Sequence, residues 1–219
     1  MTQHANRARR PARSIAVFLL LAAAIYAALL AAWPMAGGVY ARGFRATGNY
    51  LFGSMGGASV RYRAAAQTIV YADTDVVVRN LRTGDEAARP MSTRYRGYYP
   101  AAMLVALAVA TPLPWRRRLR ALAWGLVVLQ ALIAWRELMI LLEVLSGDNP
   151  VATIALSPFW RGALESVSRP LGASTASTFV LPVLVWIAVT FRGRDWARLF
   201  GDSDARPRER VTGGHSHGP

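Results

Sequence analysis

Residues 98–120, YYPAAMLVALAVATPLPWRRRLR, decide the fold that the sequence predicts. Two tyrosines begin this stretch, an apolar run follows, and four arginines lie within its last five residues. Tyrosine rings are enriched at the headgroup level of a membrane, and arginines beside an apolar run mark its cytoplasmic end. We therefore expect residues 98–115 to cross a bilayer and a cytoplasmic basic turn to follow at residues 116–120. The arginines expected to contact lipid headgroups are Arg116, Arg117, Arg118 and Arg120.

The composition of the chain favours a membrane protein. Of its 219 residues, 53% are hydrophobic and 17% are charged, and all 26 basic residues are arginine. The net charge of +14 would suit nucleic acid, but the arginines lie beside apolar runs, where anionic lipid headgroups attract them. Membrane lipids are therefore the expected partner, and no nucleic acid is expected. The sequence contains no cysteine, which excludes disulfides, thiolate metal sites and cysteine nucleophiles.

Three further apolar runs have the length of a membrane crossing. Residues 15–33 are uncharged and reach about 30 Å at about 1.5 Å per residue, which is one hydrocarbon thickness. They follow a basic segment at residues 1–14 and exceed the apolar core of a signal peptide, so we expect an uncleaved anchor. Residues 121–145 and 172–191 give two more crossings. The predicted fold class is a membrane all-α protein, a bundle of four transmembrane helices.

Arginines at the ends of these runs predict the orientation in a bacterial inner membrane. Arg192, Arg194 and Arg198 follow the last run, as the basic turn follows residues 98–115. By the positive-inside rule, the basic turn and both chain termini lie on the cytoplasmic side. The cytoplasmic tail is then residues 192–219, and the two periplasmic segments are residues 34–97 and 146–171.

The periplasmic segments carry signals for local structure. Glycines between Gly37 and Gly57 predict a flexible start. Three runs rich in β-branched and aromatic residues then predict a small outward β-ribbon, with strands at residues 59–63, 67–71 and 75–79. In the second segment, Ser157 as a cap and Pro158 at the first helical position predict a short interfacial helix.

Charged residues within the run 121–145 give the candidate binding site. Ionisable groups at membrane depth are costly, so Arg136 and Glu137 are functional candidates by default. The alternative is that Arg136 snorkels to the surface and that Glu137 and Glu143 pair with it or with loop arginines, with no further role. If the run 98–115 lies antiparallel beside them, it brings a cationic and aromatic set to the same level, which would suit a carboxylate, a phosphate headgroup or a polypeptide backbone. That set consists of Tyr95, Arg96, Tyr98 and Tyr99.

The sequence lacks the patterns of the common enzyme sites. No phosphate loop, dinucleotide fingerprint or metal motif occurs, and no histidine lies between His4 and His215 to activate a hydroxyl. His215 and His217 in the tail lack a third ligand for a metal. We therefore predict a protein that is not an enzyme, with no catalytic residues, no metal and no cofactor.

The order of these motifs resembles a family of small bacterial proteins, the exosortase H-associated membrane proteins. The resemblance rests on the Tyr-Tyr-Pro start and arginine-rich end of residues 98–120 and on residues 181–186, LPVLVW. The chain is also distantly similar to the exosortase/archaeosortase core, in which Arg136 matches an arginine near the outer end of a span. The cysteine and histidine of that core have no counterpart in this sequence.

The resemblance implies a non-enzymatic accessory protein of a protein-sorting or envelope-assembly system. Its partner would be an exosortase-type membrane enzyme or the tailed substrates of that enzyme, bound at the outer face. The alternative is a small transporter or lipid-handling protein that uses Arg136 and the nearby glutamates Glu137 and Glu143.

Overall fold

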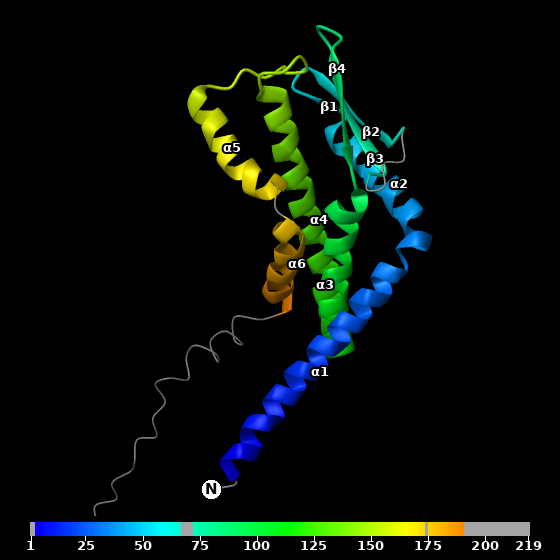
Figure 1. Cartoon of the computed structure of the whole chain (residues 1–219), viewed down its shortest axis with the longest axis vertical. Coiled ribbons are helices and arrows are strands. Elements are labelled where there is room, and N and C mark those ends of the chain that lie inside the picture. Colours follow the sequence, from blue (N-terminus) through cyan, green and yellow to red (C-terminus); the bar gives the residue numbers. More distant parts are fainter. Residues whose placement is uncertain (1–2, 67–71, 174, 191–219) are drawn as a thin grey trace, which may run out of the picture.

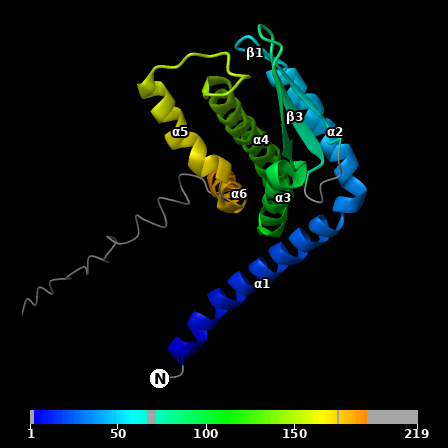
Figure 2. The same ribbon diagram turned by 45° about the horizontal axis from the view of Figure 1, so that its top comes forward.

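The computed structural model describes residues 3–66, 72–173 and 175–190. A four-stranded sheet, α2 and α5 lie around one end of the long helix α4, while α1, α3 and α6 surround its other end (Figure 1, Figure 2). In chain order the elements are α1 (Gln3–Ala31), α2 (Trp33–Phe52), β1 (Ser54–Met55), β2 (Ala58–Ala64), β3 (Thr74–Asn80), β4 (Glu86–Met91), the π-helix η1 (Arg94–Tyr98), α3 (Tyr99–Ala110), α4 (Trp115–Ser146), α5 (Pro158–Ala173) and α6 (Thr175–Thr190).

The four strands form an antiparallel sheet in the order β1-β2-β3-β4. Side chains along a strand point alternately to its two faces. In β2 this alternation buries Ala58, Val60 and Tyr62, and Tyr62 lies opposite Val76 of β3. The buried face packs against the end of α2 and the C-terminal half of α4. This core contains Phe52, Val60, Val78, Leu141, Leu145 and Val151.

The helices at the other end of α4 share a second core. Leu104 of α3 and Leu129 of α4 are fully buried, and Val185 of α6 packs with them. The indole Nε1 of Trp186 donates a hydrogen bond of 2.9 Å to the hydroxyl of Thr111, where α3 ends. These contacts hold α3, α4 and α6 together below the sheet.

The predicted all-α bundle of four transmembrane helices is wrong. The chain combines helices with a four-stranded antiparallel sheet, and among the described residues only α4 is long and apolar enough to cross a membrane by itself. The helix α3 has 12 residues and α6 has 16, so at about 1.5 Å per residue they fall short of the ~20 residues that a crossing needs. A second candidate is the bent pair of residues 15–31 and α2, which passes the same test only when both helices are taken together.

The predicted basic turn is also wrong. The chain reverses at Thr111–Pro114, and residues 116–120 form the first turns of α4 instead. The guanidinium groups of Arg117 and Arg118 donate hydrogen bonds to the backbone oxygens of Thr190 (2.9 Å) and Thr111 (3.1 Å). Carbonyl groups at the end of a helix lack helical partners, so these two arginines satisfy the ends of α6 and α3. Arg116 and Arg120 are exposed, and headgroup contact stays a prediction for all four.

Two of the predicted strands and the predicted start of the helix at Pro158 are confirmed. The strands predicted at residues 59–63 and 75–79 correspond to β2 and β3, and α5 begins at Pro158 as predicted. The strand predicted at residues 67–71 lies outside the described residues. Instead of a ribbon, a four-stranded sheet forms, because β4 adds to β3 and the short β1 adds to β2. The position of α5 at a membrane interface stays a prediction.

The glycine-rich segment is a helix and not the flexible start that the sequence predicted. It forms α2, which begins after a 74° bend next to α1 and carries Pro34 in its first turn. An added Cβ at Gly48 would lie 2.8 Å from the ring of Tyr62, so this glycine permits close packing of β2 on α2. The amide of Asn49 bonds to the backbone of Tyr62 in both directions, at 2.7 and 3.0 Å.

The close approach at Gly48 gives a matched pair of substitutions. We expect Gly48→Ala to lower the free energy of unfolding by about 1–3 kcal/mol, because the methyl group collides with Tyr62. Gly38→Ala on the same helix meets no atom within 4 Å, so we expect it to stabilise by about 0.5–1 kcal/mol through helix propensity. Thermal unfolding in detergent, followed by circular dichroism, measures both. Equal effects of the two substitutions would contradict this packing.

Candidate binding site

A buried ion pair joins η1 to α4. The guanidinium of Arg96 donates from Nη1 to Oε1 of Glu137 at 2.7 Å, and the two side chains are 16% and 7% exposed. Arg96 occupies the middle of the π-helix, a form of helix that often marks functional sites because its extra residue re-aims the side chains. A charge-assisted bond of this length in a protected position is strong, so it fixes η1 against α4.

The start of η1 is held by the turn before β3. The carboxylate of Asp73 accepts a hydrogen bond from the backbone N–H of Thr93 (3.1 Å) and another from its hydroxyl (2.8 Å). Thr93 is fully buried and directly precedes Arg94. The sheet therefore sets where η1 begins, and with it the position of Arg96. Asp73 is visible in the sequence as a residue of a turn. Its hydrogen-bond partner Thr93 is 20 residues away, so no local sequence pattern identifies this contact.

Arg136 gives this region an excess positive charge. Its side chain is buried, with 8% of the residue exposed. Arg136 interacts electrostatically with both Arg96 and Glu137. Its Nε has no hydrogen-bond partner among the described residues. Because Arg136 is buried, the alternative that it snorkels to the surface does not describe this structure. Two arginines and one glutamate leave this charge cluster with a net charge of +1.

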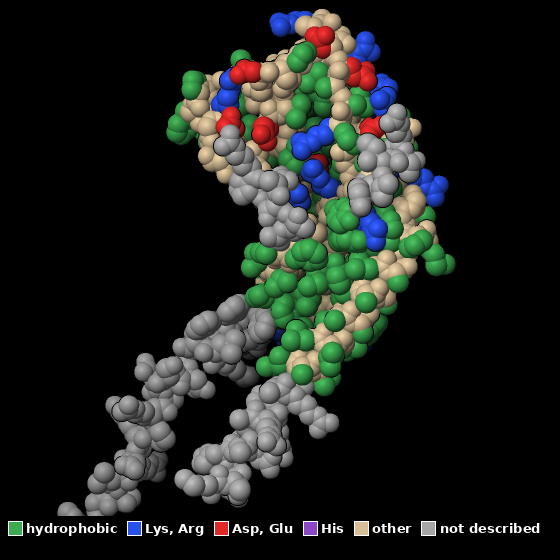
Figure 3. All heavy atoms as spheres, viewed as in Figure 1, with side chains coloured by type: hydrophobic (Ala, Val, Ile, Leu, Met, Phe, Trp, Pro, Cys, Tyr) green, Lys and Arg blue, Asp and Glu red, His purple; other side chains and the backbone are tan. Residues whose placement is uncertain are grey.

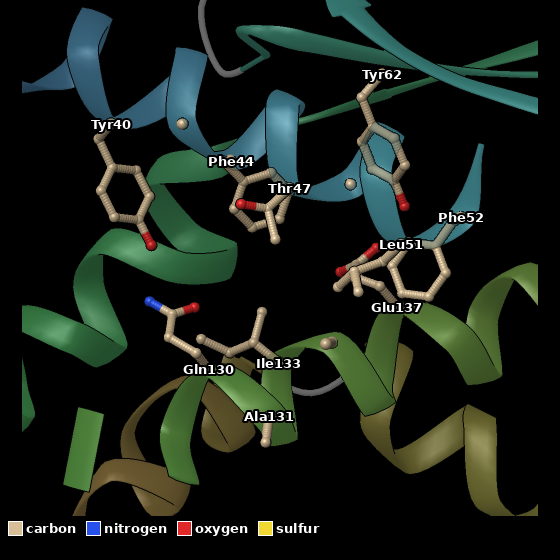
Figure 4. Close-up of a pocket in the computed structure, with 13 residues that line it drawn as sticks. Tyr40, Phe44, Thr47, Leu51, Phe52, Tyr62, Gln130, Ala131, Ile133 and Glu137 are labelled. Carbon is tan, nitrogen blue, oxygen red and sulfur yellow. The ribbon is translucent and has the colours of Figure 1, made fainter. Parts of the chain in front are cut away.

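A largely apolar cleft of about 560 Å³ lies on one side of Glu137, between α2 and α4. Most of its wall consists of aromatic and aliphatic side chains, and the polar groups lie at its two ends (Figure 4). The hydroxyl of Tyr40 points toward the amide of Gln130 at one end. The lining residues are Tyr40, Gly43, Phe44, Thr47, Gly48, Leu51, Phe52, Tyr62, Gln130, Ala131, Ile133, Ala134 and Glu137.

The other end of the cleft contains a tyrosine hydroxyl opposite Glu137. Tyr62 is 3% exposed, and its hydroxyl points toward the Glu137 carboxylate (Figure 4). The hydroxyl has no hydrogen-bond partner among the described residues. Burial raises the pKa of Tyr62, the charge of Glu137 raises it further, and the charge of Arg96 lowers it. The phenol is therefore protonated at neutral pH and presents an O–H donor.

A smaller cavity of about 170 Å³ lies on the other side of the ion pair. It is bounded by β3, β4 and α4, and its charged lining residues are Arg89, Arg96 and Glu137. In the space-filling view, basic side chains gather on the hollowed face between α5 and the sheet (Figure 3). Glu137 is thus shared by two cavities, one with an aromatic wall and one with a mainly aliphatic wall that includes Arg89 and Arg96.

The other predicted site residues divide between this cluster and a separate aromatic group. The hydroxyl of Tyr98 donates to the backbone oxygen of Leu29 at 2.7 Å, and its ring packs on Trp33 with centroids 4.8 Å apart. Tyr95 and Tyr99 contact each other, and the guanidinium of Arg94 lies over the Tyr99 ring at 5.0 Å. These tyrosines pack where α1, α2 and η1 meet, whereas Arg96, Arg136 and Glu137 form the charge cluster.

Glu143 belongs to neither cavity next to Glu137. It is exposed and lines a polar cavity of about 720 Å³ between α4 and α5, with Asp148, Arg161 and Glu165. Among the described residues, no group of three or more histidine or acidic side chains is arranged to hold a metal ion, and His215 and His217 lie outside those residues.

Comparison with known proteins gave no relative. No protein-family profile, curated protein or solved structure matches this chain.

The ion pair makes a prediction about stability that a double-mutant cycle tests. We expect Glu137→Gln to cost about 3–5 kcal/mol, because it leaves Arg96 and Arg136 buried together without a counter-charge. Arg96→Gln should cost less, since Glu137 keeps the opposite charge of Arg136. The double variant Arg96→Gln, Glu137→Gln should cost less than the sum of the two single variants, because it leaves one buried arginine without a counter-charge instead of two. Additive costs, measured by thermal unfolding in detergent, would show that the pair is not coupled.

Proposed function

We propose that this chain is a non-enzymatic membrane accessory protein that binds an anionic group of a partner or substrate at the charge cluster of Arg96, Arg136 and Glu137. The carrying observation is the buried Arg136, which has an unpartnered Nε and no second carboxylate to balance its charge within the described residues. An unbalanced buried cation is costly in the free protein. A carboxylate or phosphate from a bound molecule would neutralise it.

The approach to the cluster from the sheet side suits an anion. Arg89 and Arg96 line the smaller cavity beside Glu137, and arginine forks match carboxylate and phosphate oxygens in pairs. The cavity is too small for a folded domain. A chain end, an exposed side chain or a single headgroup fits this space better.

The surface of the helical end supports a location in the bacterial inner membrane. Large apolar side chains are exposed on α1, α4 and α6, and apolar atoms cover much of this end (Figure 3). Leu20 is 71% exposed, Trp124 66% and Leu184 55%. Contiguous apolar surface of this kind marks contact with a membrane or with another protein. Placement of the N- and C-termini in the cytoplasm remains part of the proposal and rests on the arginine distribution.

The class of partner rests on the sequence alone. The resemblance to exosortase H-associated membrane proteins favours an exosortase-type membrane enzyme or its tailed substrates. The chain has no cysteine, so a cysteine-dependent cleavage would be carried out by the partner. A carboxylate or phosphate on that partner is the group that we expect the charge cluster to bind, with Arg89 and Arg96 lining the approach.

Lipid handling is the second candidate function, and the apolar cleft favours it. At about 560 Å³, the cleft falls within the size range of small-molecule sites and has a mainly apolar wall. Transport along Arg136 and the glutamates has less support, because Glu143 is exposed and lines a different cavity.

Substitution of Arg136 tests the proposed function. We expect Arg136→Gln to weaken partner binding about ten- to hundredfold, because one charge-assisted contact is lost. Its melting temperature should be equal or higher, since the change leaves Arg96 and Glu137 as a neutral pair. The tagged protein is purified from its native cells in mild detergent, and the proteins cross-linked to it are quantified by mass spectrometry.

The control is Arg120→Gln, an exposed position on the same helix, which should keep the partner. Recovery of the same partner in equal amounts with Arg136→Gln would overturn the proposal. A lower melting temperature for Arg136→Gln would give Arg136 a structural role instead.

A further inference from the structure

We propose that the cleft between α2 and α4 binds a neutral single-chain membrane lipid whose hydroxyl head group lies between Tyr62 and Glu137. This ligand differs from the anion proposed for the charge cluster. The inference rests on the cleft and its polar end, so it deepens the second candidate function, lipid handling, and does not depend on anion binding at the charge cluster.

The wall of the cleft matches a hydrocarbon chain. Phe44, Phe52, Ile133 and Ala134 contribute apolar surface from α2 and α4, and Glu137 is the one ionisable carboxyl group among the lining residues. Apolar area removed from water contributes about 25 cal/mol per Å². An alkyl chain would be stabilised along the cleft, whereas a polar ligand would lose hydration there without compensation.

The polar end of the cleft requires a group that both donates and accepts hydrogen bonds. The Tyr62 hydroxyl is buried and has no partner among the described residues, which is unfavourable for a hydroxyl group in the free protein. It points toward the Glu137 carboxylate (Figure 4), which only accepts hydrogen bonds. A ligand hydroxyl placed between them would accept from Tyr62 and donate to Glu137.

The charge at this end selects a neutral head group. Arg96 already neutralises Glu137 through their 2.7 Å ion pair. A fatty acid carboxylate would face the Glu137 carboxylate at close range, which like charges disfavour. An alkylammonium group has donors but no acceptor for the Tyr62 hydroxyl. A long-chain alcohol satisfies both partners without adding charge.

The mouth of the cleft lies where a lipid can enter. Gly43, Thr47 and Leu51 on α2 and Gln130 and Ala131 on α4 are exposed lining residues. The helices α4 and α2 belong to the two segments that qualify as candidate membrane spans. A chain entering sideways from the bilayer would therefore pass between these two helices to reach Tyr62.

Gly43 gives a direct way to fill the cleft. It lines the cleft, and an added Cβ there would meet no atom within 4 Å, so a larger side chain extends into the cleft without a clash at its base. Gly38 is also on α2 with nothing within 4 Å of an added Cβ, and it does not line the cleft. Leucine at either position has the same effect on helix propensity.

The experiment uses the full-length protein in detergent with a dodecanol analogue that carries a photoreactive diazirine in its chain. After illumination, mass spectrometry maps the labelled residues. We expect labelling of the cleft segments of α2 and α4, its loss to background in Gly43→Leu, and unchanged labelling in Gly38→Leu. Tyr62→Phe keeps the ring that packs on Gly48 and removes the donor, so affinity should fall about three- to tenfold.

Several outcomes would overturn this inference. One is equal labelling of wild type and Gly43→Leu, and another is labelling confined to the exposed apolar side chains of α1 and α6. Stronger labelling by the matching carboxylate or ammonium probe would refute the neutral hydroxyl. Melting temperatures of all three variants are measured alongside, and Gly38→Leu shows what a leucine on α2 does without filling the cleft. Gly43→Leu leaves the charge cluster of Arg96, Arg136 and Glu137 unchanged. If the proposed function is right, this variant should therefore still recover the partner, whether or not the cleft binds the lipid.

Discussion

The ion pair between Arg96 and Glu137 is the interaction on which the arrangement of this protein depends. Arg96 lies in η1, the short helix that follows the last strand of the sheet. Glu137 lies within the long helix α4. Two opposite charges removed from water must stay together, because either one alone would be costly. The pair therefore fixes the sheet side of the molecule against α4, while Asp73 fixes where η1 begins.

The same pair divides the surrounding space into two chemical environments. On the side of α2, Glu137 faces an aromatic cleft and the hydroxyl of Tyr62, and its charge is balanced there. On the side of β4, Arg89 and Arg96 face a smaller cavity, and Arg136 adds a buried positive charge to the cluster. One carboxylate thus lines both the aromatic cleft and the smaller cavity that Arg89 and Arg96 also line.

The charged and phenolic groups of these two environments supply fixed hydrogen-bond donors. Arginines are permanently charged and do not exchange protons at neutral pH, and burial keeps the Tyr62 phenol protonated. The group of Trp33, Tyr98 and Arg94 stabilises the junction of α1, α2 and η1 and lines neither cavity, although Trp33 and Tyr98 contact Tyr40 of the cleft wall. It shows that nearness in sequence to Arg96 did not bring a residue to the same site.

Features that depend on local pattern could be predicted from the amino-acid sequence. Runs of β-branched and aromatic residues located β2 and β3, Ser157 and Pro158 located the start of α5, and ionisable groups in an apolar run singled out Arg136 and Glu137. The glycine-rich segment also contained a helical signal that the prediction of a flexible start overlooked. Its buried positions recur at helical spacing in α2, where small residues allow close packing and do not indicate flexibility. These positions are Gly37, Ala41, Gly48 and Phe52.

The contacts of those residues depend on the folded chain and could not be predicted from local pattern. The π-helix re-aims Arg96 toward Glu137, 41 residues away, and turns Tyr98 toward Leu29 instead. The addition of β4 to β3 and the end of α3 at Thr111 likewise depend on partners distant in the chain. Hydrophobic periodicity describes which face of an element is buried, but not which charge or strand lies opposite it. Burial of Arg136 without a second carboxylate among the described residues is therefore a property of the folded chain that no stretch of its sequence displays.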